Sequence, residues 1–121
     1  MNILSPSILA ADFCHLQEDI LAAQAGGAKW LHIDVMDGVF VPNTTFNVET
    51  VKGLTKCHKM VNDVHIMVAN PKKVALEYVD AGADLITFHY EAVECPICAG
   101  KIINMLHEKG CKAGISIKPN T

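Results

Sequence analysis

Apolar runs of strand length alternate with stretches of helical period along almost the whole chain, and this alternation most constrains the fold. The apolar runs cover residues 3–9, 30–36, 61–68, 85–91 and 112–119. The first stretch between them has helix-terminal signals, with Asp12 suited to an N-cap and Gly26 and Gly27 suited to the helix end. A strand followed by a helix, repeated in this order, predicts a parallel sheet with crossover helices.

Two architectures accept five parallel strands joined by helices, namely the α/β barrel and the open doubly wound sheet. We expect the later helices over about residues 48–57, 70–83 and 96–109. The first strand is not followed by the G-x-G-x-x-G sequence with which an open sheet binds a dinucleotide. We therefore favour the barrel, and we expect residues 1–121 to form a single domain.

Composition and charge exclude several classes of partner. The chain carries 10 basic and 13 acidic side chains, for a net charge of -3, and has no basic cluster that would attract nucleic acid or an anionic membrane. No apolar run reaches the roughly 20 residues of a membrane span, and the N-terminus lacks the basic stretch of a signal peptide. The 5 cysteines do not resemble a secreted disulfide framework. We therefore expect a cytoplasmic protein with reduced thiols and no nucleic-acid or membrane partner.

Polar side chains lie at even spacing in the second and third expected strands. Because residues two apart in a strand share a face, His32, Asp34 and Met36 should point together, as should His65 and Met67. In a barrel, the two strands would bring His32, Asp34 and His65 to the C-terminal rim, where such barrels keep their active sites. Two imidazoles and a carboxylate suit a catalytic divalent metal with open positions. For each residue alone the alternative is a hydrogen-bonded structural role, but the combination favours the metal site.

Several segments of the chain are recognisable together. They are SPSILAADF (5–13), HIDVMDGVFVPN (32–43), DVHIMV (63–68), AGADLITFHYEA (81–92) and GCKAGISIKPNT (110–121). In this order they resemble the N-terminal half of the ribulose-phosphate 3-epimerase family, over essentially the whole chain. The resemblance implies a (β/α)8 TIM barrel, here truncated after its fifth strand, since a complete barrel takes about 250 residues. It also implies a carbohydrate isomerase of the pentose phosphate pathway, which interconverts ribulose 5-phosphate and xylulose 5-phosphate.

The resemblance further implies a role for each site residue. His32, Asp34 and His65 would bind one divalent metal ion, zinc or ferrous iron, with manganese or cobalt as alternatives. Asp34 would also be one of two acid/base groups that move the C3 proton on opposite faces of a planar enediolate. The second such aspartate, which is also the fourth protein ligand, and the phosphate-binding loops would lie beyond residue 121. The residues expected to contact the ketose phosphate substrate are Ser7, His65, Met36 and Met67.

Two alternatives to this function stay open. A six-carbon substrate such as allulose 6-phosphate fits nearly the same pattern, and a non-catalytic half-barrel that serves in assembly fits the missing second aspartate. We expect the isolated chain to lack epimerase activity, because one base cannot serve both faces of the substrate. We also expect a homo-oligomer, because a half-barrel leaves unpaired sheet edges.

Three other features have mainly structural interpretations. Cys95 and Cys98 have the C-x-x-C spacing of some metal and redox sites, but without a second pair we expect them to pack at a helix start. His89 and Glu91 could border the pocket or make structural hydrogen bonds. His58 falls in a helical segment, and we expect it to be solvated.

Overall fold

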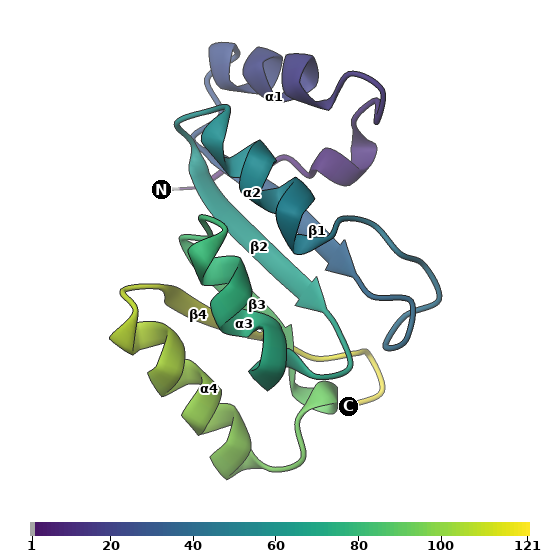
Figure 1. The fold of residues 1–121 in the computed structure, drawn as a ribbon, viewed down its shortest axis with the longest axis vertical. Coiled ribbons are helices and arrows are strands. Elements are labelled where there is room, and N and C mark those ends of the chain that lie inside the picture. The colour runs from purple at the N-terminus through teal and green to yellow at the C-terminus, as the bar shows by residue number, and fades with distance from the viewer. Residues whose placement is uncertain (1) are drawn as a thin grey trace.

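The fold is a four-stranded parallel sheet with strand order β1-β2-β3-β4, seen in a computed structural model that describes residues 2–121 (Figure 1). Each strand leads to the next through a helix, so the predicted α/β alternation is confirmed and fits a partial TIM barrel. The strands are β1 (Trp30–Met36), β2 (Val61–Met67), β3 (Leu85–His89) and β4 (Lys112–Ser116). The helices are α1 (Leu16–Ala25), α2 (Val48–Lys56), α3 (Pro71–Asp80) and α4 (Pro96–Glu108).

The core lies between one face of the sheet and the helices that cover it (Figure 1). In β1 and β2 every second residue is buried, which is the pattern of strands whose two faces differ. The buried set is apolar and includes Ile33, Val64 and Phe88, each 0% exposed. Because side chains alternate along a strand, the residues between the buried ones point to the opposite face of the sheet. His32 and Asp34 are among them.

Helix ends are fixed by residues that the sequence supplies at the right places. The Asn47 side chain accepts a hydrogen bond from the Thr50 backbone N–H and caps α2, and Asn70 caps α3 in the same way, followed by Pro71. After α3 the chain turns at Gly82, whose φ is 113°. A Cβ at this position would lie 2.5 Å from Thr55 Oγ1, so both the backbone conformation and the space require glycine.

The prediction of a strand over residues 3–9 was wrong. This segment meets β1 only at an isolated bridge between Ser7 and His32, where the His32 N–H donates to the Pro6 carbonyl over 2.9 Å. Pro6 itself has no N–H to donate, and the chain turns into a short 3₁₀ helix at Ile8–Ala10. The described sheet therefore has four strands where five were expected.

Three boundaries also differ from expectation. Asp12 does not cap α1, which begins at Leu16 after His15; the Asp12 carboxylate instead accepts the Cys14 N–H in a local turn. The strand expected over residues 85–91 ends at His89, because a 3₁₀ helix follows it, and the last strand ends at Ser116. Among residues 2–121, none of the helices has both the length and the apolar character needed to cross a bilayer.

Candidate metal centre

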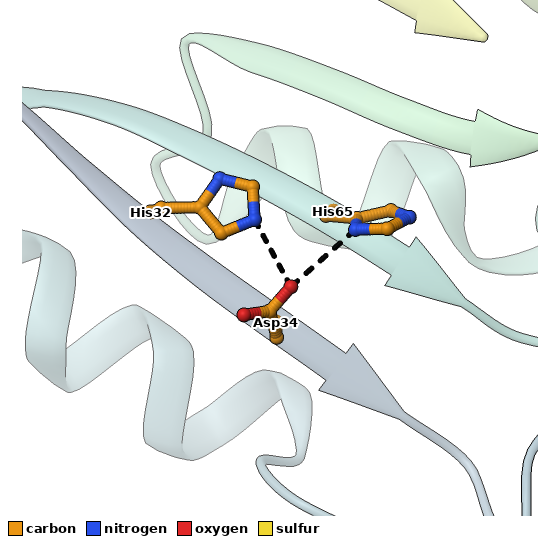
Figure 2. A group of neighbouring side chains, drawn as sticks. All are labelled: His32, Asp34 and His65. Atoms are coloured by element: carbon orange, nitrogen blue, oxygen red, sulfur yellow. Dashed lines mark hydrogen bonds and ion pairs between the residues drawn. The ribbon is translucent and has the colours of Figure 1, made fainter. Parts of the chain in front are cut away.

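The pairing of β1 with β2 brings the predicted ligands together. The two strands run parallel with Asp34 opposite His65 and His32 opposite Asp63. His32 and Asp34 are two residues apart in β1 and therefore share a face, and His65 lies on the same face of the neighbouring strand (Figure 2). The convergence expected from strand phase is present, while the role of these residues as metal ligands stays a prediction.

The Asp34 carboxylate lies between the two imidazoles. Its Oδ1 is 3.0 Å from His32 Nε2 and 3.3 Å from His65 Nδ1 (Figure 2). One nitrogen from each histidine and one oxygen from Asp34 all lie within 4.8 Å of one another. The three side chains are half-buried, with 25%, 13% and 19% of their surfaces exposed for His32, Asp34 and His65. These three residues could therefore hold one metal ion with positions left open for substrate.

Asp63 orients His32 from the side away from Asp34. Its Oδ2 is 2.8 Å from His32 Nδ1 and also accepts the Ser5 hydroxyl over 3.0 Å. Because a carboxylate only accepts, Nδ1–H donates to Asp63, and Nε2 faces Asp34 as the nitrogen that would coordinate a metal after losing its own proton. The sequence prediction missed Asp63, although it lies two residues before His65 and thus on the same face, which was a sufficient signal.

A second hydrogen-bond chain orients His65. His89 Nδ1 is 3.1 Å from Glu91 Oε1, and His89 Nε2 is 2.8 Å from His65 Nε2. The Glu91 carboxylate accepts from His89 Nδ1–H, and a second hydrogen bond joins the Nε2 atoms of His89 and His65. His65 Nδ1 faces Asp34 Oδ1 at 3.3 Å and donates its hydrogen to that carboxylate, and a bound metal would displace this proton. Of the two roles left open for His89 and Glu91, this is the hydrogen-bonding one.

The carboxylates make the centre attractive to a cation. Hydrogen bonds to Asp34 and Asp63 raise the pKa of His32 to about 10, although burial opposes this shift. Burial raises the pKa of Asp34, but hydrogen bonds from His32, His65 and Ser7 outweigh it and hold that pKa well below its usual range. Asp34 is therefore a carboxylate at neutral pH, and positive charge at the centre is favoured.

The remaining predicted site residues are Ser7, Met36 and Met67. The Ser7 hydroxyl donates a hydrogen bond to Asp34 Oδ2 over 2.8 Å, so Ser7 contacts one of the predicted ligands directly. Met36 and Met67 lie opposite each other in register at the ends of β1 and β2, and both are half-buried. A cavity of about 500 Å³ lies toward the helix-covered side, where Val35 and Tyr78 line it, and Met36 also borders it.

Similar proteins cover nearly the whole of this chain. The ribulose-phosphate 3-epimerase of Mycobacterium tuberculosis is 45% identical over 119 residues, which are 98% of this chain and 50% of that protein. The ribulose-phosphate 3-epimerase of Treponema pallidum is 42% identical over 118 residues, 98% of this chain and 53% of that protein. The chloroplastic ribulose-5-phosphate-3-epimerase of Arabidopsis thaliana is 38% identical over 119 residues, 98% of this chain and 42% of that protein.

The chain spans about half the length of the curated relatives it matches. Residues 3–121 match the family described as the ribulose-phosphate 3 epimerase family, which is nearly the full sequence. Together with the parallel α/β sheet and the identities above, this match confirms the expected family. The chain belongs to the ribulose-phosphate 3-epimerase family.

Proposed function

We propose that the protein to which these residues belong is a ribulose-phosphate 3-epimerase that converts D-ribulose 5-phosphate to D-xylulose 5-phosphate. One observation carries the proposal: the Asp34 carboxylate faces an imidazole nitrogen from each of two neighbouring parallel strands, at 3.0 and 3.3 Å. The relatives, which bear the name of this activity, supply the substrate class. The isomerase class follows from the same reaction.

His32, Asp34 and His65 would hold one divalent metal ion. Imidazole and carboxylate ligands suit zinc or ferrous iron, with manganese or cobalt as alternatives. When bound, such an ion supplies positive charge that stabilises the negative charge developing on the substrate oxygens. The hydrogen bond that His32 donates to Asp63 and the one between His65 and His89 support this proposal, because each orients a ring so that its opposite nitrogen faces Asp34.

The chain's own residues would move one proton and exclude water. Asp34 is ionised and could take the C3 proton that lies next to the substrate ketone. Ser7 fixes the Asp34 carboxylate through Oδ2 and could turn its hydroxyl to substrate. Met36 and Met67 offer apolar, deformable side chains next to the same face and could keep water from the reacting carbons. We accordingly propose that the substrate is contacted by Ser7, His65, Met36 and Met67.

The partners that we propose follow from the charge and the strand edges. A net charge of -3 without a basic cluster gives no attraction to nucleic acid or membrane, so we propose a cytoplasmic enzyme that acts on a small ketose phosphate. For residues 1–121 produced alone we propose a homo-oligomer, because within residues 2–121 β4 pairs with β3 alone and leaves an open edge. Cytoplasmic location and oligomeric state are both open to direct measurement.

A chimera tests the activity. Residues 1–121 joined to the second half of the Mycobacterium tuberculosis relative should interconvert the two pentulose phosphates at an ordinary turnover of about 10 per second. The Asp34→Asn chimera should lose this activity, while Asp12→Asn, which changes an exposed carboxylate outside the centre, should keep it. The 121 residues alone should show negligible turnover, because they offer one base. An Asp34→Asn chimera as active as its parent would contradict the proposal, and faster turnover of allulose 6-phosphate would reassign the substrate.

A further inference from the structure

Two cysteines that the metal centre does not use begin helix α4. Cys95 is the N-cap, and its Sγ accepts the backbone N–H of Cys98 over 3.2 Å. Pro96 occupies the first turn, and Cys98 is the third residue of the helix. The Cys95 sulfur therefore lies over the first helical turn on the side of residue 98. The helix-start role expected from the sequence is present, and it also brings the two thiols together.

The two thiols differ in how readily they ionise. Hydrogen bonds from the side chain and the backbone of Cys98 lower the pKa of Cys95, and the Cys95 side chain raises the pKa of Cys98. The positive end of the helix adds to the stabilisation of a thiolate at the N-cap. Both thiols are half-exposed, whereas Cys111 is buried and its pKa is raised by that burial. Such an unequal pair contains one attacking and one resolving thiol.

A cleft next to Cys98 offers room for a small reactant. It has a volume of about 360 Å³ and lies between the start of α3 and the start of α4, with Cys98 on its wall and the N-cap Cys95 just outside its lining. Its charged side chains are Lys72, Lys101 and Glu94, so the ammonium groups outnumber the carboxylate. A volume of this size falls within the range of small-molecule sites, roughly 300–1,000 Å³. The excess of positive charge favours a reactant that carries carboxylates.

We propose that Cys95 and Cys98 form a redox-active dithiol that exchanges with small anionic disulfides such as glutathione disulfide. The Cys95 thiolate attacks one sulfur of the disulfide, forms a mixed disulfide and releases one thiolate of the reactant. Cys98 then loses its proton and attacks the Cys95 sulfur, which forms the Cys95–Cys98 bond and releases the second thiolate. The two cysteines lose two electrons and two protons, and glutathione disulfide is reduced to two molecules of glutathione.

Trapping experiments on the reduced chain test the pairing. Trypsin should release residues 74–101, a peptide that contains Cys95 and Cys98 and no other cysteine. After exposure to glutathione disulfide and alkylation, this peptide should be lighter by two hydrogens and carry no alkyl group, while Cys14, also exposed, is alkylated. Cys98→Ser should accumulate glutathione on Cys95, and Cys95→Ser should react several-fold more slowly. Glutathione on Cys98 but not on Cys95, or oxidation no faster than at Cys14, would overturn the proposal.

Reactants of opposite charge test the cleft. Lys72→Gln should slow the reaction with glutathione disulfide several-fold and should not slow the reaction with cystamine, a cationic disulfide. Lys56→Gln, at the end of α2 and outside the cleft, is the matched control and should leave both rates unchanged. Equal effects of Lys72→Gln on the two reactants would overturn the assignment of anionic disulfides.

Discussion

Replacing Asp63 by alanine should weaken metal binding, although Asp63 is not one of the three proposed ligands. In the parent, Asp63 Oδ2 lies 2.8 Å from His32 Nδ1 and fixes both the tautomer and the orientation of the ring. Without this acceptor, the proton of His32 can occupy the nitrogen that should coordinate, and the ring is free to rotate. Part of the binding energy must then restore the geometry that Asp63 now maintains.

The size of the effect follows from the position of Asp63 in the centre. Loss of a hydrogen-bond partner of a metal-ligating histidine typically lowers metal affinity by about 10- to 100-fold. This range corresponds to about 1.4–2.8 kcal/mol. Asp63→Asn should lose less than Asp63→Ala, because the asparagine oxygen can still accept from Nδ1–H. Ser5→Ala should lose least, since Ser5 contacts Asp63 and not the histidine.

Calorimetric titration of the metal-free proteins with zinc is the assay. Circular dichroism of each variant establishes that the fold is retained, so that a lower affinity can be attributed to the centre. Equal affinities of the parent and Asp63→Ala would refute the reasoning. An affinity of Asp63→Asn as low as that of Asp63→Ala would show that the charge of Asp63 matters and its acceptor oxygen does not.

Three further predictions concern stability and association. Gly82→Ala should destabilise the fold by more than the roughly 1–2 kcal/mol of left-handed backbone strain, because the new Cβ would also meet Thr55. Gly53→Ala, where a Cβ on α2 meets open space, should stabilise the fold by about 0.5–1 kcal/mol. Urea unfolding measures both changes. Burial lowers the pKa of His58, so the unfolded chain binds a proton at this imidazole more tightly than the folded chain does. The free energy of unfolding should be highest above the unfolded pKa of about 6.5 and should fall as pH drops below it. His58→Gln should reduce this pH dependence, measured by urea unfolding. Residues 1–121 produced alone should self-associate, as measured by light scattering. Ile115 is 47% exposed on β4, the strand with a free edge, and Ile115→Lys should reduce the association. A monomeric parent would contradict this prediction.

Much of the fold was predictable because alternating burial leaves a direct trace in the sequence. The β1 pattern of apolar residues with His32 and Asp34 between them shows two faces, and the same phase in β2 places His65 beside them. The segment at residues 3–9 was misassigned because an apolar run also suits a 3₁₀ turn once Pro6 removes a hydrogen-bond donor. Local pattern alone does not separate these two outcomes.

Two features that the sequence pattern did not predict lie just after the end of a strand or a helix. The partner of Glu91 is decided by where β3 ends and a 3₁₀ helix begins, and strand phase carries no information about this turn. His58 was expected to be solvated and is instead buried, with its Nδ1 accepting the Met60 N–H over 2.9 Å. It follows α2, which ends at Lys56, instead of lying in the helix.

The central claim is that His32, Asp34 and His65 form one divalent metal site. Elemental analysis after equilibrium dialysis against zinc measures this most directly, by comparing the parent with the His32→Ala, Asp34→Ala and His65→Ala variants. His15→Ala is the control, because it removes an exposed histidine outside the centre, whose Nδ1 lies 2.9 Å from Asp12 Oδ2. We predict one equivalent of zinc in the parent and the control, and much less in each of the three variants. Equal zinc content in all five proteins would contradict the account.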